Sequence, residues 1–379
     1  MLIAQAVQIL DQIFPREMQQ AYDSCGFQCG RSSRELKGIM LGLDITEEMI
    51  LEAEQRGCNL LLTHHPLLFH PLRRLGEETR VERLVHSLLE RGMSAYAAHT
   101  NLDAMPNGVN GVLADTWGLL NRQALEPLKG SLMQLVVYVP LEHVETVRNA
   151  LFAAGAGGIG KYNEASFGLQ GVGTFKPMEG ANPFVGSVHS RESVEEIRLE
   201  VVLEQWKSRQ VLQAMKQAHP YEEVAYQLIA LEQSTPSYGL GLVGDLPKPM
   251  SRQELLDLWA TTLGCSLRYS TNSVANATIL SSPINRIAFC GGAGADLWPN
   301  AKAAGAQAYL TSEIKHHHFL DAADQLLLVE AGHAETEIPA IARIQAIIQP
   351  FFSTFAILQI SSLQIPTRYF PLPNSNHGS

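Results

Sequence analysis

Strands and helices alternate along most of this 379-residue chain, and that alternation is what most restricts its fold. The pattern begins with a predicted strand at 36–43, a helix at 46–56 and a strand at 60–62. An amphipathic helix at 77–91 and a strand at 94–98 follow. Strands that alternate with helices form a largely parallel sheet with helices on its faces. We therefore predict an α/β fold for this part of the chain.

A different order of elements begins near residue 129. The sequence predicts a strand, a helix, two strands, a helix and a strand, at 133–139, 142–154, 164–175, 195–203, 205–216 and 222–231. The order β-α-β-β-α-β is typical of a ferredoxin-like fold. A module of about 110 residues has the usual size of a domain. We therefore expect an inserted ferredoxin-like α+β domain.

The alternation returns after the insert, with strands predicted at 240–244, 284–290, 307–311 and 325–331. The length of the chain also favours more than one domain. We expect a split α/β domain with a largely parallel sheet, interrupted by the insert. Its first half, the insert, its second half and a disordered Pro/Asn/Ser-rich tail are predicted at 1–128, 129–237, 238–370 and 371–379.

The composition excludes several classes of protein. A net charge of −10 and a pI near 5.7 argue against a nucleic-acid-binding protein, because such proteins neutralise phosphates with Lys and Arg. No window has the roughly 18 apolar residues of a membrane span, and the N-terminus lacks the basic start of a signal peptide. The five cysteines form no paired C-x-x-C set, so no thiolate zinc site or disulfide framework is indicated. We expect a cytoplasmic protein that does not bind a membrane.

Two adjacent histidines, His64 and His65, follow the strand at 60–62. Neighbouring side chains on a strand point to opposite faces, so the two rings converge only if the chain leaves the strand there. Pro66 makes such a turn plausible. Two neutral imidazoles at one place favour a divalent metal site. A pair of loop histidines without a metal is the alternative, because histidine needs no special role.

Residues of types that bind metals follow three of the predicted strands. His64 and His65 follow the strand at 60–62, His99 and Asp103 follow the strand at 94–98, and His333 and Glu337 follow the strand at 325–331. In open α/β sheets the ligand site lies outside the carboxyl ends of the strands. We therefore expect residues that are distant in sequence to meet at one edge. The sequence predicts a metal site formed by imidazoles and carboxylates.

Pro339 restricts where the helix near His333 and Glu337 can begin. Proline is tolerated in the first turn of a helix but not further along. The sequence therefore predicts a helix that starts near 335–337, with His333 in the preceding loop and Glu337 in the first turn. The helix dipole would favour a carboxylate there.

Five strong ligands, His64, His65, Asp103, His333 and Glu337, are too many for one tetrahedral zinc ion. They suit two divalent ions about 3.5–4 Å apart, with Glu337 as the bridge. Zinc, iron and manganese all accept these ligand types. His99 is either a sixth ligand or a partner of Asp103, a water or the substrate, and we favour the second alternative. Because imidazole titrates near neutrality, His99 and His317 are the candidate catalytic residues for proton transfer.

Four motifs make the chain resemble the NGG-interacting-factor-three-like family, also called GTP cyclohydrolase I type 2 homologues. They are Thr63-His-His-Pro-Leu-Leu-Phe69, His99-Thr-Asn-Leu-Asp103, Thr311-Ser-Glu-Ile-Lys315 and Gly332-His-Ala-Glu-Thr-Glu337. In the insert, Gly158-Ile-Gly-Lys-Tyr162 and His219-Pro-Tyr-Glu-Glu-Val-Ala-Tyr226 resemble the long-form subgroup. Departures such as Ala165 for Cys and Tyr22 for Trp touch no ligand position.

The resemblance implies a dinuclear metal site on the same five ligands, and a toroidal homohexamer with its sites facing an inner cavity. It also suggests a substrate, because the family name refers to opening the imidazole ring of GTP. We predict either of two functions. The first is a metal-dependent hydrolase that acts on a nucleotide or a related small molecule. The second is a metal-handling or regulatory protein without turnover, whose insert binds a partner or an effector.

Overall fold

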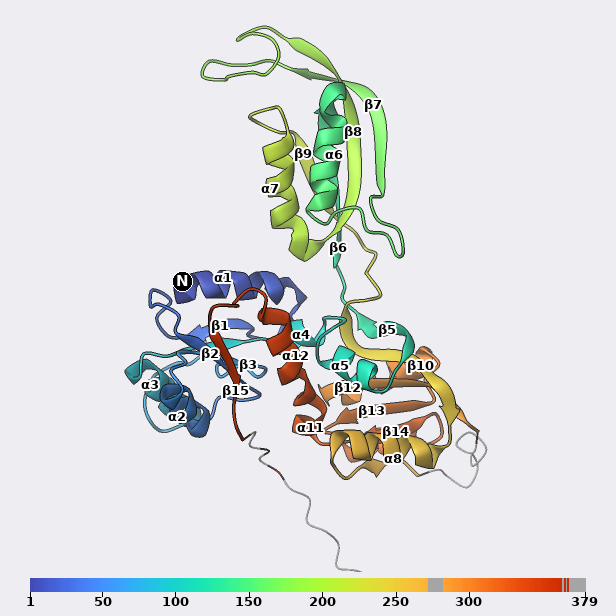
Figure 1. Cartoon of the computed structure of the whole chain (residues 1–379). Helices are drawn as coiled ribbons and strands as arrows, with labels where there is room; N and C mark the ends of the chain where they lie inside the picture. The colour runs from blue at the N-terminus through green and yellow to red at the C-terminus, as the bar shows by residue number, and fades with distance from the viewer. Residues whose placement is uncertain (272–281, 363–364, 366, 368–379) are drawn as a thin grey trace, which may run out of the picture. The chain divides into compact units, whose positions relative to one another are not determined.

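The computed structural model describes residues 1–271, 282–362, 365 and 367 (Figure 1). The chain divides into two compact units. The larger unit contains Met1–Pro127 and Pro236–Ser379, and the insert contains Leu128–Thr235. The sequence predicted the insert at 129–237, which differs by one and two residues at its ends. The predicted disordered tail, 371–379, lies outside the described residues.

The first sheet of the larger unit has the strand order β1-β4-β3-β2-β15. Neighbouring strands from β4 to β15 are parallel, whereas β1 is antiparallel to β4. Because β15 comes from the C-terminal part of the chain, both halves build this sheet. The strands are Gly26–Cys29 (β1), Gly38–Gly42 (β2), Leu60–Thr63 (β3), Ser94–Ala97 (β4) and Ala356–Gln359 (β15).

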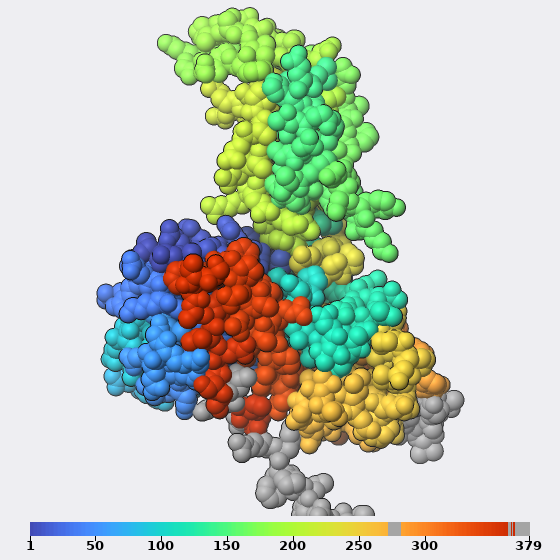
Figure 2. All heavy atoms as spheres, in the orientation of Figure 1, coloured from blue at the N-terminus to red at the C-terminus, as the bar shows by residue number. Residues whose placement is uncertain are grey.

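Helices cover both faces of the first sheet. Successive side chains of β2 point to opposite faces: Ile39 and Leu41 pack against α1 and α12, and Met40 packs against α2 and α3. Figure 2 shows the C-terminal atoms, in red, lying against the N-terminal atoms, in blue. The helices are Ile3–Ile13 (α1), Glu47–Gln55 (α2), Arg80–Glu90 (α3) and Pro339–Ile348 (α12).

The second sheet of the larger unit has the strand order β11-β14-β13-β12-β10-β5. Its three central strands, β12 to β14, are parallel, and the outer strands are antiparallel to their neighbours. The strands are Leu120–Pro127 (β5), Gly239–Met250 (β10), Arg268–Tyr269 (β11), Ile284–Ala293 (β12), Ala308–Ser312 (β13) and Leu327–Glu330 (β14).

Helices also cover both faces of the second sheet. On one face, Trp117 from the end of α5 and Trp259 from α8 pack with Phe289 of β12. On the other face, Ala301 of α9 and Ala322 of α10 pack against the same strands. The helices are Val109–Thr116 (α5), Arg252–Leu263 (α8), Trp298–Ala303 (α9) and His316–Ala322 (α10).

The predicted α/β class is confirmed, with a difference in how the strands are distributed. The described part of the larger unit contains two sheets, and the second sheet is mixed rather than largely parallel. Alternation of strand and helix predicts parallel neighbours, but it does not reveal which strands pair. The sequence also missed β5, because most of its side chains are exposed and it lacks an apolar run.

The carboxyl ends of the parallel strands position the polar loops. In the first sheet, β2 ends before Asp44, β3 before His64, and β4 before His99. In the second sheet, β13 ends before Glu313 and β14 shortly before His333. Loops at such ends are the usual place for a ligand site in an α/β fold.

The insert has its own sheet and core. Its elements follow the order β-α-β-β-α-β, and its antiparallel sheet has the strand order β7-β8-β6-β9. Apolar side chains of β6 and β8 pack against α6 and α7. The elements are Leu132–Pro140 (β6), Val144–Ala153 (α6), Ser166–Phe175 (β7), Glu192–Glu204 (β8), Ser208–Ala218 (α7) and Tyr226–Ala230 (β9).

Among the helices of the described residues, none combines the length and the apolar character that crossing a bilayer requires.

We propose that the insert is an autonomously folding domain. A fragment of residues 128–235 should then show one cooperative thermal transition by circular dichroism, because its sheet and core are complete. Leu199→Ala removes a fully buried side chain of that core and should cost about 2–5 kcal/mol of unfolding free energy. Leu169→Ala, at a 58% exposed position, is the matched control. A fragment without a folded spectrum would contradict the proposal.

Candidate metal centre

His64 and His65 lie at the carboxyl end of β3, where the chain leaves the strand. The backbone N–H of His65 donates to the carbonyl of Leu43, and the Thr63 hydroxyl donates to the carbonyl of His65. These bonds turn the backbone so that both rings lie on the same side, with their centroids 5.1 Å apart. The predicted exit from the strand therefore brings the two imidazoles together.

Each imidazole of the cluster uses its Nδ1 atom to contact an acceptor of the protein. The acceptors are the Ala98 carbonyl for His64 (2.8 Å), Asp44 Oδ1 for His65 (3.0 Å), Asp23 Oδ1 for His99 (2.9 Å) and Glu313 Oε1 for His333 (2.7 Å). An acceptor at Nδ1 favours the tautomer in which Nε2 carries a free lone pair. This arrangement is typical of histidines that bind a metal through Nε2.

The free Nε2 atoms converge on the carboxylates. His64 Nε2 lies 3.6 Å from both Asp103 Oδ1 and Glu337 Oε1. The other oxygen of Glu337, Oε2, lies 3.0 Å from His65 Nε2 and 3.2 Å from His333 Nε2. The two oxygens of one carboxylate therefore face two separate groups of ligand atoms.

The arrangement fits metal coordination better than direct hydrogen bonding. His64 Nε2, Asp103 Oδ1 and Glu337 Oε2 are buried, and within the described part of the chain they have no hydrogen-bond partner. Two ligand atoms about 2.0–2.1 Å from one tetrahedral ion lie about 3.3 Å apart. The observed separations of 3.0–3.6 Å have this size. The residues present therefore fit divalent ions.

Charge also favours cations at this place. Burial alone would lower the pKa of His65, but contacts with Asp44 and Glu337 raise it to about 10. Burial opposes protonation of His333 as well, yet Glu337 and Glu313 raise its pKa to about 9. Burial favours the neutral form of Glu337, but the surrounding imidazoles hold its pKa well below the usual value. The site therefore stabilises positive charge, which protons or metal ions supply.

Gly292, at the end of β12, makes room for the ligands. A Cβ atom at this position would lie 2.2 Å from Glu337 Oε1 and 3.3 Å from His333 Nε2. Its φ angle of 65° is also in the left-handed region, which side chains disfavour. Gly291, the preceding residue, also lies close to Glu337, since a Cβ atom there would lie 3.8 Å from Glu337 Cγ.

His99 is held by a buried carboxylate that sequence reasoning did not assign to the site. Asp23 binds His99 through Oδ1, and its Oδ2 accepts hydrogen bonds from the Thr100 backbone (3.0 Å), the Thr100 hydroxyl and Cys25 (3.0 Å). Burial raises the pKa of Asp23, but these hydrogen bonds outweigh it and hold the pKa below its ordinary value. An ionised Asp23 fixes the orientation of the His99 ring.

The structure places the predicted ligands in two groups that share His65. His64, His65 and His99 have ligand atoms within 4.8 Å of one another, and so do His65, His333 and Glu337. Asp103 is next to this cluster through its contact with His64. The structure therefore brings all the predicted ligands and His99 to the same place.

His317 is not brought into the cluster. It is exposed near the start of α10, and its ring lies against His318, with centroids 4.3 Å apart. None of the short contacts among the described cluster residues involves it. The catalytic role of His317 stays a prediction, and the geometry gives no support for it.

The predicted position of Glu337 in a first helical turn is wrong. Helix α11 begins at His333 and ends at Glu337, and α12 begins at Pro339. Proline takes the first position of α12, where its missing N–H is tolerated, so the helix breaks before it. His333 and Glu337 lie four residues apart on the short helix α11, which places both side chains on one face.

Two orienting carboxylates, Asp23 and Asp44, were missed as parts of the site. Glu313 follows the strand predicted at 307–311, among residues of which one was expected to face the site, but its contact with His333 was not predicted. Glu313 directly follows β13 and Asp44 stands two residues after the end of β2, so the rule that placed the histidines at strand ends also applies to them. Glu313 carries a further signal, since its φ of 56° is unusual for a residue with a side chain. Asp23 follows no such strand, and only the folded chain places it beside His99.

The fold and the site define a split α/β protein with an imidazole and carboxylate cluster that could hold metal ions. The chain belongs to the Duf34/NIF3 (NGG1p interacting factor 3) family, which matches residues 1–365. A Mycobacterium leprae protein named "GTP cyclohydrolase 1 type 2 homolog" is 37% identical over 366 residues, which cover 96% of this chain and 94% of that protein. A Bacillus subtilis protein with the same name is 36% identical over 336 residues, 88% of each chain.

Solved structures agree with this assignment. A Bacillus cereus protein described as related to NIF3 has a TM-score of 0.82 and 31% identity, and the match covers 97% of this chain and 98% of that one. A Staphylococcus aureus protein has a TM-score of 0.72 at 24% identity, over 98% of this chain and 99% of the other. The second likeness shows the fold alone.

Gly292→Ala should weaken metal binding. The added Cβ overlaps Glu337 Oε1 and displaces a predicted bridging ligand, so we expect a loss of about 10–100-fold in metal affinity. Competition with a chromophoric chelator measures this affinity on the purified full chain.

Gly305→Ala is the matched control for this change. Gly305 also has a positive φ, of 78°, but among the described residues its Cβ would come within 4 Å of Arg286 Cδ alone, at 3.9 Å. Gly305→Ala introduces the same kind of backbone strain but adds no atom near the metal ligands. Equal metal affinities of the two variants would contradict the assigned role of Gly292.

Proposed function

We propose that this chain is a metal-dependent hydrolase with a dinuclear site, acting on a nucleotide or a related small molecule. The observation that carries the proposal is the position of Glu337. Its Oε1 lies 3.6 Å from His64 Nε2, which also lies 3.6 Å from Asp103 Oδ1. Its Oε2 lies near Nε2 of His65 and of His333. A carboxylate shared in this way is the expected bridge of a two-metal hydrolytic site.

The proposed ligands fall into two groups around the bridge. His64, Asp103 and Glu337 would hold one divalent ion, and His65, His333 and Glu337 the other. Imidazole and carboxylate ligands accept zinc, iron and manganese alike, so the ligand set leaves the metal open. Bound there, the two ions would supply Lewis-acid activation of water and of an electrophilic carbon or phosphorus centre.

His99 is proposed to move the proton in the reaction. Asp23 accepts a hydrogen bond from Nδ1, which leaves Nε2 as the nitrogen with a free lone pair. One ring nitrogen of His99 lies within 4.8 Å of ligand atoms of His64 and His65. In this tautomer Nε2 can accept a proton from the attacking water and later deliver it to the leaving atom. Asp23 acts as a positioning residue, which also stabilises the imidazolium that forms.

The surroundings of the cluster support a small heterocyclic substrate. A cavity of about 210 Å³ opens beside Asp103 and is lined with polar groups of Asn110 and Gln123. This volume is below the usual 300–1,000 Å³ of sites that enclose a drug-sized ligand, so it suits part of a nucleotide. Exposed aromatic rings of Phe69 and Tyr22 lie near His99, where a planar base could stack. The names of the curated relatives point to the same class of substrate.

The alternative function is a metal-handling or regulatory protein without turnover. The burial of His64 and Glu337 favours this metal-handling role, because deeply enclosed ligands suit storage or sensing of an ion. Such a protein should exchange metal readily and leave every substrate unchanged. The toroidal homohexamer that the resemblance implies also stays a prediction for this chain.

Glu337→Gln should abolish most of the turnover by metal-loaded protein. The amide has the size of the carboxylate, but it lacks the charge that a bridge between two cations needs. We expect a fall in kcat/KM on the order of 100-fold or more, measured on a panel of nucleotides that includes GTP. Removal of metal with a chelator should have the same effect on the unchanged chain.

Glu335→Gln is the control for this variant, since it makes the same chemical change on helix α11. Turnover that survives in Glu337→Gln would contradict the hydrolase. Metal-loaded protein that binds ions but is inactive on the whole panel would favour the metal-handling alternative.

Asp23→Asn should lower kcat while leaving metal content unchanged. The amide can donate a hydrogen bond to Nδ1, which favours the wrong tautomer of His99. We expect a loss of about 10²–10⁴-fold in kcat with a much smaller change in KM. If the variant instead loses bound metal to the same extent as it loses kcat, Asp23 holds the metal ligands in place and does not act through the His99 tautomer.

The difference between Asp23→Asn and the unchanged chain should also depend on pH. The folded-state pKa of Asp23 is held below its ordinary value. Its contribution to stability is therefore complete above about pH 4 and is lost as the pH falls through the folded pKa. Urea unfolding at several pH values should show the variant less stable at neutral pH, with a gap that narrows in acid. A gap that widens in acid would contradict this sign.

A further inference from the structure

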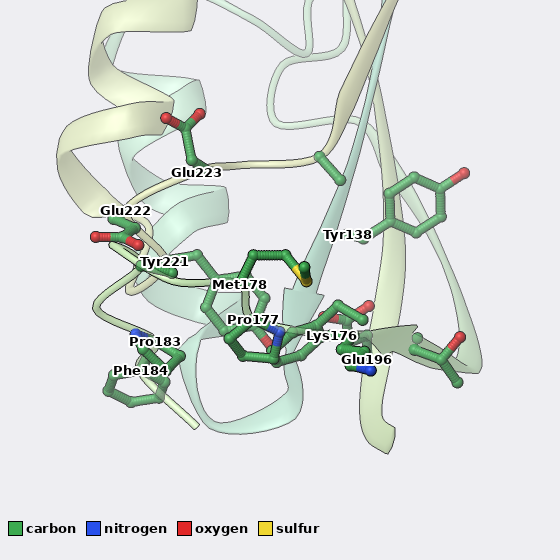
Figure 3. Close-up of a pocket in the computed structure, with 15 residues that line it drawn as sticks. Tyr138, Lys176, Pro177, Met178, Pro183, Phe184, Glu196, Tyr221, Glu222 and Glu223 are labelled. Atoms are coloured by element: carbon green, nitrogen blue, oxygen red, sulfur yellow. The ribbon is translucent and has the colours of Figure 1, made fainter. Parts of the chain in front are cut away.

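The insert contains a cavity of about 460 Å³ whose lining comes entirely from the insert. Tyr138 of β6, Glu196 of β8 and the segments 173–184 and 221–225 surround it. Figure 3 shows Met178 and Pro177 over the centre of the cavity, with Pro183 and Phe184 at one end and Tyr138 at the other. The volume lies within the range of sites that enclose small organic ligands.

Apolar and aromatic groups of this cavity remain exposed. Met178 and Phe184 are 60% and 55% exposed, although both are large hydrophobic side chains. The Tyr221 ring links Phe175 and Phe184, with centroid distances of 5.9 and 6.2 Å. Three aromatic rings thus form a wall whose faces a ligand can contact. Exposed apolar surface gathered in a concave place is typical of a binding site.

A buried carboxylate lies in the same cavity. Glu196 is only 8% exposed, and glutamate is rarely buried so deeply without a charged partner. Among the described residues, its recorded partner is the Tyr221 hydroxyl, which donates to Oε1 over 3.0 Å. Its Oε2 is close to Gly173, where an added Cβ would lie 2.1 Å away. The position of Glu196 therefore depends on a tyrosine and on the absence of a side chain at 173.

The charge of the lining is negative. The lining includes three carboxylates, from Glu196, Glu222 and Glu223. Among the described lining residues, one basic side chain, Lys176, stands against them. Lys176 is exposed, whereas Glu196 is buried. Figure 3 shows Glu222 and Glu223 at the margin of the cavity. Within the described residues Glu196 forms no ion pair with Lys176 or another cationic side chain, and its printed hydrogen bond comes from a neutral hydroxyl. A buried carboxylate of this kind favours a ligand that brings positive charge.

We propose that the insert binds a small organic cation, an amine or quaternary ammonium carried on an apolar body. The cationic group lies near Glu196, and the apolar body lies against Phe184, Tyr221 and Met178. Aromatic faces attract ammonium groups, and a carboxylate adds to that attraction where water is excluded. The site lies wholly within the insert and is independent of the candidate metal centre.

The test compares three ligands of one shape on the full-length protein. Phenethylamine is cationic, phenethyl alcohol is neutral and 3-phenylpropionate is anionic at neutral pH. Saturation-transfer NMR detects binding, and isothermal titration calorimetry gives the affinity. We expect phenethylamine to bind at least tenfold more tightly than the neutral compound and the anion to bind most weakly. Equal affinities, or no binding of phenethylamine at millimolar concentration, would overturn the proposal.

Variants of neighbouring glutamates locate the site. Glu196→Gln keeps the acceptor for Tyr221 but removes the charge, so the preference for the amine should fall at least tenfold. Glu195→Gln makes the same change one residue earlier on β8, at an exposed position that points to the opposite face. It should leave the affinity unchanged. Equal effects of the two variants would overturn the assignment of Glu196.

A second contact is tested by Phe184→Ala, which alters an exposed side chain and leaves the core of the insert intact. We expect a loss of affinity of at least fivefold for phenethylamine with an unchanged thermal midpoint. An unchanged affinity in this variant would contradict the proposed position of the ligand. These binding measurements do not require turnover at the metal centre. The proposed ligand site of the insert is therefore tested separately from the proposed hydrolase activity.

Discussion

The side chain of Glu337 is the constraint on which the rest of the site depends. It is almost completely buried, yet its pKa is held well below the ordinary value, so it carries a negative charge in the interior. Burying an ion costs several kcal/mol unless other charges compensate for it. Three imidazoles face its two oxygens within 3.0–3.6 Å, and each imidazole is held from behind by an acceptor at Nδ1. Positive charge between these atoms, as metal ions or as protons, stabilises the whole arrangement. Gly292 then becomes necessary, because any side chain there would occupy the space that the carboxylate needs.

The fold supplies this arrangement by directing the carboxyl ends of two sets of parallel strands to one place. His64, His65 and His99 follow strands of the first sheet, while Glu313 and His333 follow strands of the second and Gly292 lies at the end of its strand β12. Strand β15 and helix α12 return to the first sheet, so residues after the insert complete a layer begun before it. An interruption of more than a hundred residues therefore separates the ligands in sequence without separating them in space.

The ligands could be predicted because each stands at, or a few residues beyond, the end of an apolar strand, and parallel strands direct such positions to a common edge. The groups that orient them were harder to find. Asp23 lies 76 residues before His99 and meets it only after folding, and no local pattern marks that contact. Strand pairing was similarly hard to predict, because the short strand β1 and the exposed strand β5 carry little periodicity. One sheet was expected for the α/β domain, whereas the described residues of the larger unit form two. The preference of proline for the first turn of a helix correctly marks the start of a helix at Pro339. That helix is α12, whereas Glu337 belongs to the preceding helix α11. The cavity of the insert could not be predicted at all, because loops and strand ends distant in sequence line it.

Anomalous diffraction from crystals of the full chain grown with a divalent transition metal would show whether Glu337 bridges two ions. Two peaks are expected in each chain: one among His64, Asp103 and Glu337 Oε1, and one among His65, His333 and Glu337 Oε2. A single peak that leaves either oxygen of Glu337 without a cation would contradict the bridging role. Peaks away from these side chains would contradict the metal centre itself.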